Sequence, residues 1–234
     1  MDQNERKKVL KPRVSVVLPA RLAQETIADS CRSVLSQDFE DIELIVVVNG
    51  PIDKTPEIVL SLGDGRIKLT ESDEGIVPAL NRGLALARGE IIARQDADDV
   101  WLPGKMSRQV AAFDSGLGNV IGTQMKVVQK GNQDSVTEYP LAHEEILGWF
   151  GQVKNPIGHP SVAYKRSVID RVGGYWDFFP FAEDFDLWMR MLPYARFANL
   201  DAVGVQYNFT PNPRYSHDVP RYLIKHYASL YRAQ

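Results

Sequence analysis

Short, almost wholly apolar runs that alternate with helix-like segments constrain the fold of this chain most. The runs are VSVVL (14–18), IELIVVV (42–48), RIKLT (66–70) and EIIAR (90–94), and helical periodicity lies between them, near 25–36 and 77–88. Alternating strands and helices predict βαβ units around a mainly parallel sheet, and near-continuous apolarity predicts that both faces of the sheet are covered. We therefore expect an α/β fold, an α/β/α sandwich with a mainly parallel, Rossmann-like mixed central sheet.

Composition and charge exclude several classes of protein. Of the 234 residues, 44% are hydrophobic and 24% are charged, as in an ordinary globular domain. A net charge of -3 provides no general attraction for nucleic acid. The one cysteine, Cys31, excludes an intramolecular disulfide and is expected to be a small core residue. We expect a basic N-terminal segment over 1–12, one domain over 13–210 and a basic amphipathic segment over 211–234.

Carboxylates gather directly after the fourth apolar run, in IIARQDADDVW (91–101). In a parallel sheet, ligands bind at the carboxyl ends of the strands. Asp96 and Asp98 would share one face of an extended chain, and Asp99 would point elsewhere. Paired carboxylate oxygens suit a hard divalent ion, Mg²⁺ or Mn²⁺, that carries a diphosphate. The alternative is that Asp98 and Asp99 cap a following helix whose first turn contains Pro103.

A second acidic pair, Glu183 and Asp184, stands at the expected start of a helix that contains EDFDLWMRML. The helix dipole favours the charged form there, so we expect an ionised Asp184 at neutral pH, as a base for a sugar hydroxyl must be. Trp188 lies one turn further along and would be a platform for a sugar ring on the same face. The alternative makes the two carboxylates helix caps, pairs Asp186 with Arg190 and places Trp188 in the core.

The termini raise the question of a membrane. No stretch is long enough to span one, and the N-terminus lacks the apolar core of a signal peptide. The segment 211–234 combines basic residues with aromatic residues at roughly helical spacing. Such a helix can lie on an anionic membrane or pack on its own domain. We expect a cytoplasmic protein, with peripheral contact to the inner face of the cell membrane left open.

The order and spacing of five motifs together resemble family 2 glycosyltransferases of the GT-A fold. The motifs are VSVVLPA, IELIVVVNGPIDKT, GIVPALNRGLALARGEIIARQDADDVWLPGK, NPIGHPSVAYKRSVIDRVGGY and AEDFDLWMR, and the resemblance covers about 13–210. It is most similar to bacterial enzymes of exopolysaccharide and lipopolysaccharide biosynthesis, including the amylovoran-type group. The resemblance divides the domain into a nucleotide-binding half, about 13–115, and an acceptor half, about 116–210.

The resemblance implies an inverting, metal-dependent hexosyltransferase. It would move a sugar from a nucleotide-diphosphate donor, with a UDP-sugar favoured, to a hydroxyl of a glycan or polyprenyl-diphosphate-linked acceptor. Asp98 with Asp96 would hold Mg²⁺ or Mn²⁺ in the family's DxD motif, and Asp184, beside Glu183, would be the catalytic base. Residues implied at the nucleotide are Pro19, Ala20, Arg21, Glu25, Asn49, Gly50, Asn81, Arg82, Gln95, Asp96, Ala97 and Asp98. Those implied at the acceptor are His159, Ser161 and Trp188, in or near a motif that also contains Asn155.

Two departures from the family pattern concern the nucleotide. Many relatives carry an Asp that bonds the nucleobase at the end of the second strand, where this chain has Asn49. An amide both donates and accepts hydrogen bonds and a carboxylate only accepts, so we expect base recognition to differ. Some relatives place a basic residue at the position of Leu80, and Arg82 is close enough to compensate.

Two other functions remain open. A catalytically degenerate nucleotide-binding or scaffold protein on the same fold would also accommodate Asn49 and the short C-terminal region. A sugar-phosphate nucleotidyltransferase shares the layered architecture. However, no Gly-rich loop with Arg or Lys follows the first strand to clamp a triphosphate.

Overall fold

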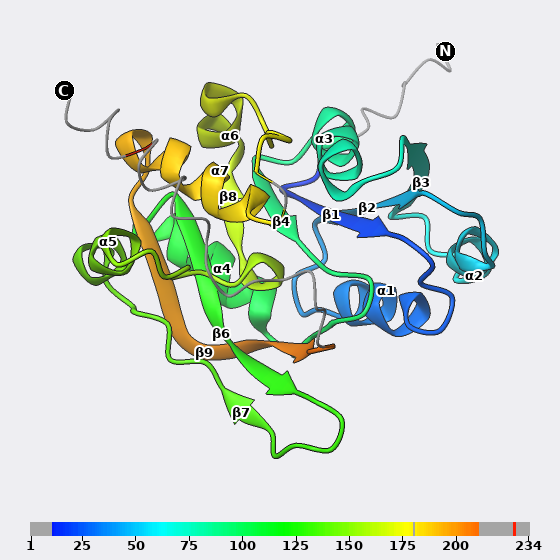
Figure 1. Cartoon of the computed structure of the whole chain (residues 1–234). Coiled ribbons are helices and arrows are strands. Elements are labelled where there is room, and N and C mark those ends of the chain that lie inside the picture. The colour runs from blue at the N-terminus through cyan, green and yellow to red at the C-terminus, as the bar shows by residue number, and fades with distance from the viewer. Residues whose placement is uncertain (1–10, 180, 211–226, 228–234) are drawn as a thin grey trace, which may run out of the picture.

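The computed structural model describes residues 11–179, 181–210 and 227. Within them, a nine-stranded sheet runs in the order β3-β2-β1-β4-β8-β6-β9-β5, with β7 attached to β6 (Figure 1). The strands are β1 (Val14–Ala20), β2 (Ile42–Asn49), β3 (Ile67–Ser72), β4 (Ile91–Arg94), β5 (Val100–Trp101), β6 (Val120–Val128), β7 (Ser135–Val136), β8 (Ala163–Lys165) and β9 (Phe197–Asn208). The α-helices are α1 (Ile27–Leu35), α2 (Thr55–Ser61), α3 (Ile76–Leu86), α4 (Lys105–Asp114), α5 (His143–Gly151), α6 (Arg166–Val172) and α7 (Glu183–Met191).

The first four strands form the parallel part of the sheet. β1 pairs in parallel with β2 and β4, and β2 pairs in parallel with β3. The carboxyl ends of these strands therefore meet at one edge, as predicted. β8 then runs antiparallel to both β4 and β6, while β6 and β9 are parallel. The sheet is thus mixed, with a Rossmann-like parallel half, which confirms the predicted fold class.

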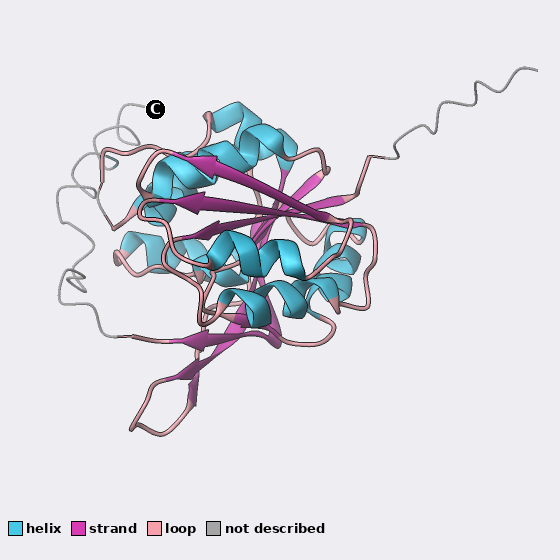
Figure 2. Ribbon diagram, turned by 90° about the vertical axis from the view of Figure 1, so that its right-hand side faces the viewer, coloured by secondary structure: helices cyan, strands magenta, loops and turns pink. Residues whose placement is uncertain are grey.

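Two apolar cores lie on opposite faces of the sheet. Along β1, Val14, Val16 and Leu18 pack in a cluster with residues of α1 and α4, whereas Val17 packs in a cluster with residues of α3 and α7. This alternation follows from the two-residue period of a strand. Figure 2 shows helices on both sides of the strands, which is the predicted α/β/α sandwich. Cys31 is fully buried in the α1 core, where desolvation raises the pKa of its thiol to about 12.

Several expected elements have different bounds in the structure. The helix expected over 25–36 is α1 (Ile27–Leu35), and the helix expected over 77–88 ends earlier, because Ala87 takes an extended conformation. α4 begins at Lys105, after Gly104 in the left-handed region, so the expectation that Pro103 lies in its first turn was wrong. The strand expected over PSVAY is divided between a 3₁₀ turn, His159–Ser161, and β8.

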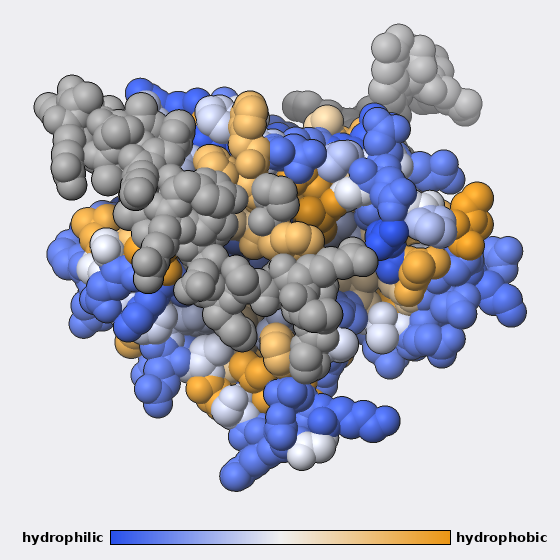
Figure 3. Space-filling model, viewed as in Figure 1, coloured by the Kyte–Doolittle hydropathy of each residue, from blue (hydrophilic) through white to orange (hydrophobic). Residues whose placement is uncertain are grey.

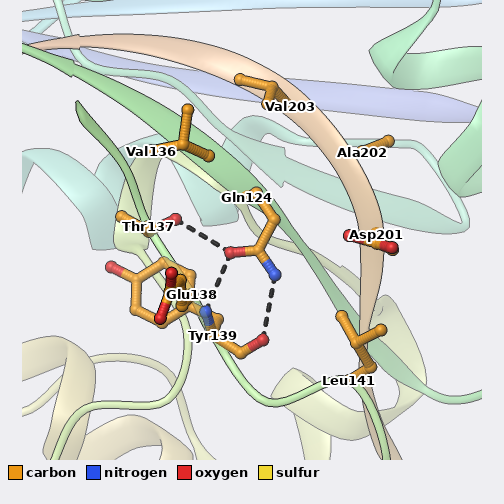
Figure 4. A pocket seen from close by; sticks show the side chains of 9 residues that line it. All are labelled: Gln124, Val136, Thr137, Glu138, Tyr139, Leu141, Asp201, Ala202 and Val203. Atoms are coloured by element: carbon orange, nitrogen blue, oxygen red, sulfur yellow. Dashed lines mark hydrogen bonds between the residues drawn. The ribbon is translucent and has the colours of Figure 1, made fainter. Parts of the chain in front are cut away.

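The second half of the chain is built around β6 and the long strand β9, which Figure 1 shows to be strongly curled. The pairing of β6 with β9 shifts register between Thr123 and Met125. Beside this irregularity lies a hollow of about 490 Å³ between the segment that begins at Val136 and residues 201–203 of β9. Figure 4 shows the Gln124 side chain in the middle of the lining residues, hydrogen-bonded to Thr137 and to both backbone groups of Tyr139.

Candidate active site

The end of β2 is tied to the end of β1 and to the start of α3 by one side chain. Asn49 is buried, its Nδ2 donates to the carbonyl of Ala20 at 3.3 Å, and its Oδ1 accepts from the amide of Gly75 at 3.3 Å. Both polar ends of the amide are thus engaged by the backbone. Asn49 positions the two loops that border the nucleotide site, and the predicted contact between its side chain and the nucleobase is not favoured.

Arg21 lies across the turn that follows β2. Its guanidinium pairs with Glu74 at 2.5 Å, and a Cβ built on Gly50 would lie 2.9 Å from Arg21 Nε. Gly50 has a φ of +81°, a backbone conformation that favours glycine. Pro19 and Ala20, at the end of β1, are buried beside this turn, and Glu25 is exposed. The predicted donor loop is therefore assembled at one edge of the sheet.

Arg82 is exposed on α3 and faces the end of β3. Its guanidinium donates two hydrogen bonds of 3.3 Å to Thr70 Oγ1. With Pro78 and residues 71–73 it lines a hollow of about 580 Å³. An exposed arginine at the carboxyl edge of the parallel strands is suitably charged for a nucleotide phosphate.

The DxD segment is a turn rather than an extended strand. The amide of Asp99 donates to the carbonyl of Asp96 at 3.3 Å, and Ser30 Oγ donates to the same carbonyl at 2.7 Å. The expectation that Asp96 and Asp98 share one face of an extended chain was therefore wrong, because β4 ends at Arg94. The Asp96 carboxylate pairs with Arg94, whereas Asp98 is exposed.

Gln95 and Asp99 hold this turn from behind. Gln95 is fully buried, and its Nε2 donates to Ser30 Oγ at 3.0 Å and to the carbonyl of Asp99 at 2.7 Å. Asp99 is also fully buried and accepts a 2.8 Å hydrogen bond from the amide of Asn208. Desolvation and the charge of Asp96 raise the pKa of Asp99 to about 8. Gln95 thus shapes the turn instead of facing the nucleotide, and Asp99 anchors it to β9 rather than capping α4.

A divalent ion fits this turn only together with a substrate. Within residues 11–179, 181–210 and 227, no three His, Cys, Asp or Glu side chains are grouped as a metal site. Asp96 and Asp98 supply two hard oxygen donors, and Mg²⁺ or Mn²⁺ takes about six ligands. Diphosphate oxygens and water would complete the shell, which is how Mg²⁺ is usually bound next to nucleotides.

The second acidic pair begins α7, as predicted. Asp184 Oδ2 accepts from Asn155 Nδ2 at 2.7 Å, and Asp184 Oδ1 accepts from the amide of Phe185 at 2.6 Å. Burial raises the pKa of Asp184, and these hydrogen bonds and the charge of Arg94 oppose that rise. Burial and the neighbouring Asp184 raise the pKa of Glu183 to about 7. The helix dipole is thus not the dominant influence on this pair, in contrast to the expectation.

Sequence reasoning missed Arg94, which connects the two acidic motifs. It is the last residue of β4 and is 4% exposed. Burial opposes its charge, but the carboxylate of Asp96 outweighs that effect and raises the pKa of Arg94. The same guanidinium acts electrostatically on Glu183 and Asp184. Its Nε is buried without a hydrogen-bond partner among the residues that the structure describes. One buried cation therefore offsets the carboxylates of both motifs.

The three residues implied at the acceptor are enclosed in the protein. Trp188 is fully buried with its ring edge-to-face against His159 and Tyr164, so the expectation that it is a platform for a sugar was wrong. His159 is buried, and its Nε2 lies 2.9 Å from the hydroxyl of Tyr175. Ser161 is also buried and donates to the carbonyl of Gly158 at 2.8 Å. These residues support the site from behind instead of lining it.

Asn81 links the nucleotide-binding helix to the loop that precedes α7. Its Nδ2 donates to the carbonyl of Tyr175, and its Oδ1 accepts from the amide of Tyr175, both at 2.9 Å. A Cβ on Gly174 would lie 2.7 Å from Asn81 Oδ1, so glycine is needed there. Asn81 is half-buried and bridges the two halves of the domain, and its implied contact with the nucleoside stays a prediction.

Comparison with known proteins gives the family of the chain. The model of glycosyl transferase family 2 matches residues 15–173. The chain belongs to this family.

Three bacterial relatives illustrate its range. The O-antigen biosynthesis glycosyltransferase WbnJ of Escherichia coli is 29% identical, over 83% of this chain and 78% of its own. The UDP-Glc:alpha-D-GlcNAc-diphosphoundecaprenol beta-1,3-glucosyltransferase WfgD of Escherichia coli is 32% identical, over 76% of this chain and 69% of its own. The amylovoran biosynthesis glycosyltransferase AmsE of Erwinia amylovora is 25% identical, over 72% of this chain and 64% of its own.

Solved structures show the same fold. TarS 1–349 of S. aureus in complex with UDP-GlcNAc has a TM-score of 0.74 at 21% identity, over 93% of this chain and 66% of its own. The mannosyltransferase PcManGT of Pyrobaculum calidifontis, in complex with GDP-Man and Mn2+, has a TM-score of 0.63 at 20% identity, over 88% of this chain and 59% of its own. These likenesses confirm the GT-A fold that the sequence predicts.

Among the described residues, no helix is both long and apolar enough to cross a bilayer. The expected basic segments lie outside the described residues, except for Lys11, Pro12 and Tyr227. The hydroxyl of Tyr227 donates to the carboxylate of Asp186, which also pairs with Arg190 at 2.7 Å as the alternative reading had it.

Proposed function

We propose that this chain is an inverting hexosyltransferase that moves a sugar from a nucleotide-diphosphate donor to a hydroxyl of a glycan or lipid-linked acceptor. The product would be part of a bacterial cell-surface polysaccharide, as the printed names of WbnJ, WfgD and AmsE suggest. The observation that carries the proposal is the presence of two acidic motifs, one on the donor side and one on the acceptor side. Asp96 and Asp98 lie at the carboxyl edge of the parallel strands, and Glu183 and Asp184 begin α7.

The nucleotide-binding half, about 13–115, would hold the donor. Arg21 and the turn at Gly50 border the nucleoside, and the exposed Arg82 is available to a phosphate. Asp98, with Asp96 behind it, would bind Mg²⁺ or Mn²⁺ together with the diphosphate. When bound, the ion acts as a Lewis acid that stabilises the departing nucleoside diphosphate. A UDP-sugar is the favoured donor, because WfgD is named for UDP-Glc and TarS is seen with UDP-GlcNAc.

The acceptor half, about 116–210, would supply the base. Asp184 would take the proton from the acceptor hydroxyl as that oxygen attacks the anomeric carbon from the face opposite the diphosphate, which inverts the configuration. Its two hydrogen bonds fix the orientation of the carboxylate. Glu183, with a pKa of about 7, can share the proton in the same site. The acceptor would be a sugar on a polyprenyl diphosphate, reached at the inner face of the cell membrane.

A degenerate nucleotide-binding protein is less well supported. Both acidic motifs retain their carboxylates: Arg94 pairs with Asp96, and Asn155 donates a hydrogen bond to Asp184. A protein that only bound nucleotide would have no use for a carboxylate pair on the acceptor side.

Thermal denaturation with a panel of nucleoside diphosphates and nucleotide sugars tests the proposal. A ligand that binds only the folded state raises the melting temperature. We expect one nucleotide to do so in the presence of Mn²⁺, and Asp98→Ala to abolish that rise. Asp134→Ala, in the exposed turn before β7, is the matched control and should keep it. If no nucleotide stabilises the parental protein, or if Asp98→Ala responds like the parent, the proposed donor site is wrong.

A further inference from the structure

The turn of residues 95–99, which carries the DxD motif, lies between β4 and β5, so its shape depends on hydrogen bonds from side chains. From α1, Ser30 Oγ donates to the carbonyl of Asp96 at 2.7 Å. From the end of β9, Asn208 Nδ2 donates to the carbonyl of Asp98 at 2.5 Å. Each aspartate of the motif therefore has its backbone carbonyl held by a side chain from another element.

Asn208 is itself fixed in place and in orientation. It is the last residue of β9, and its backbone amide donates to the buried Asp99 carboxylate at 2.8 Å. Its position beside the turn therefore does not depend on its own side chain. Gln206 Nε2 donates to Asn208 Oδ1 at 3.1 Å, which leaves the Nδ2 end of the same amide to donate to Asp98. A chain of two hydrogen bonds thus runs from Gln206 through Asn208 to Asp98.

The Asp98 carboxylate depends on this backbone support more than the Asp96 carboxylate does. Asp96 is held by its ion pair with Arg94, whereas Asp98 is exposed. The direction in which Asp98 presents its oxygens is therefore set mainly by the backbone of the turn. Ligands that are already in place bind a metal more tightly than ligands that must be ordered on binding, and hydrogen bonds from outside the ligand set provide that order.

We propose that Asn208 is a positioning residue that holds Asp98 for the divalent ion and the donor diphosphate, with Gln206 fixing the orientation of its amide. The inference rests on the proposed function, because that function places the ion at Asp96 and Asp98. It adds a contribution from the other half of the domain. β9 belongs to the acceptor half, about 116–210, yet it ends at the turn that binds the donor. Donor binding therefore requires a residue outside the nucleotide-binding half.

The Mn²⁺ dependence of nucleotide binding tests the role of Asn208. UDP, GDP, ADP and dTDP are each added to the full chain at a fixed concentration while Mn²⁺ is titrated, and the rise in melting temperature is recorded. Asn208→Leu keeps the approximate size of the side chain and the backbone bond to Asp99, but its side chain cannot donate. We expect its half-saturating Mn²⁺ concentration to be roughly tenfold higher than the parental value, the size of a lost outer partner of a metal ligand. The rise at saturating Mn²⁺ should be parental.

Gln206→Leu tests the same chain of hydrogen bonds without a change at Asn208. We expect its half-saturating Mn²⁺ concentration to be about threefold higher than the parental value, because the Asn208 amide is then less firmly oriented. The double variant should need no more Mn²⁺ than Asn208→Leu alone, since Gln206 acts only through Asn208. If the two effects multiply in the double variant, the proposed action of Gln206 through Asn208 is wrong.

A matched control and the melting temperatures separate positioning from folding. Asn132→Leu makes the same substitution in the exposed turn between β6 and β7 and should show the parental Mn²⁺ dependence. A merely structural role would lower the melting temperature without nucleotide and leave the half-saturating Mn²⁺ concentration unchanged. That result in Asn208→Leu, or in Gln206→Leu if Asn208→Leu does not fold, would overturn the inference while the donor site stands. No Mn²⁺-dependent rise in the parent with any nucleotide would overturn the proposed donor site and the inference together.

Discussion

Asn155→Ala should shift the pH dependence of sugar transfer in a direction that the structure determines. Asn155 Nδ2 donates a 2.7 Å hydrogen bond to the Asp184 carboxylate, and this bond stabilises the ionised form. A hydrogen bond to a charged group contributes about 1.5–3 kcal/mol, and we take the lower end because Asp184 is not fully enclosed. About 1.4 kcal/mol corresponds to one pH unit. Loss of the bond raises the pKa of the base, so the acidic limb should move to higher pH by roughly one unit.

The assay is the initial rate of nucleoside diphosphate release between pH 5 and pH 9, with the nucleotide sugar that best stabilises the protein. Water can replace the acceptor, since the same base would activate it. Asn155→Ala should approach the parental rate at high pH and fall below it at neutral pH. Asn132→Ala, in the exposed turn between β6 and β7, is the matched control. An unchanged acidic limb in Asn155→Ala, or a shift to lower pH, would refute the assignment of Asp184 as the base.

Three further predictions concern residues that the structure places in supporting roles. Trp188→Ala should lower the free energy of unfolding by about 3–5 kcal/mol in urea denaturation followed by circular dichroism, because the ring is fully buried; a loss below about 1 kcal/mol would contradict its place in the core. Asp99 has a folded-state pKa of about 8, above its unfolded value near 4, so the free energy of unfolding of the parental protein should decline as the pH rises from 4 through 8. Asp99→Asn should flatten that decline when unfolding is measured at pH 5 and pH 8. Asn81→Ala removes both hydrogen bonds to Tyr175 and should reduce the rate of nucleoside diphosphate release about tenfold while keeping the nucleotide-induced rise in melting temperature. Loss of that rise would show instead that Asn81 contacts the nucleotide.

The fold was predictable because its signals are local. Near-continuous apolar runs such as Ile42–Asn49 are buried along their whole length in the structure, and their alternation with helical segments determines the layers. Both acidic motifs were predictable from sequence position, since one follows a buried strand and the other begins a helix. Periodicity could also have placed Trp188 correctly, because it lies three residues from the buried Phe185 and from the buried Met191.

The supporting contacts were not predictable, because they join residues that are far apart in the sequence. Asn81 bonds the backbone of Tyr175, 94 positions away, and the Asn49 amide bonds backbone groups 26 and 29 positions away. No local pattern distinguishes such an amide from one that faces a ligand. Arg94 did carry a signal, since a single charge that ends an otherwise apolar buried strand must find a buried partner.

The central claim is that donor binding and sugar transfer depend on different residues, and Asp184→Asn tests it most directly. The amide keeps the size of the side chain but cannot take a proton. Two measurements are made on the same preparation of the protein: the nucleotide-induced rise in melting temperature in Mn²⁺, and, on a separate aliquot, the rate of nucleoside diphosphate release. We predict a parental rise in melting temperature with release reduced at least a hundredfold, in the range of a lost general base. Release at the parental rate would contradict the account.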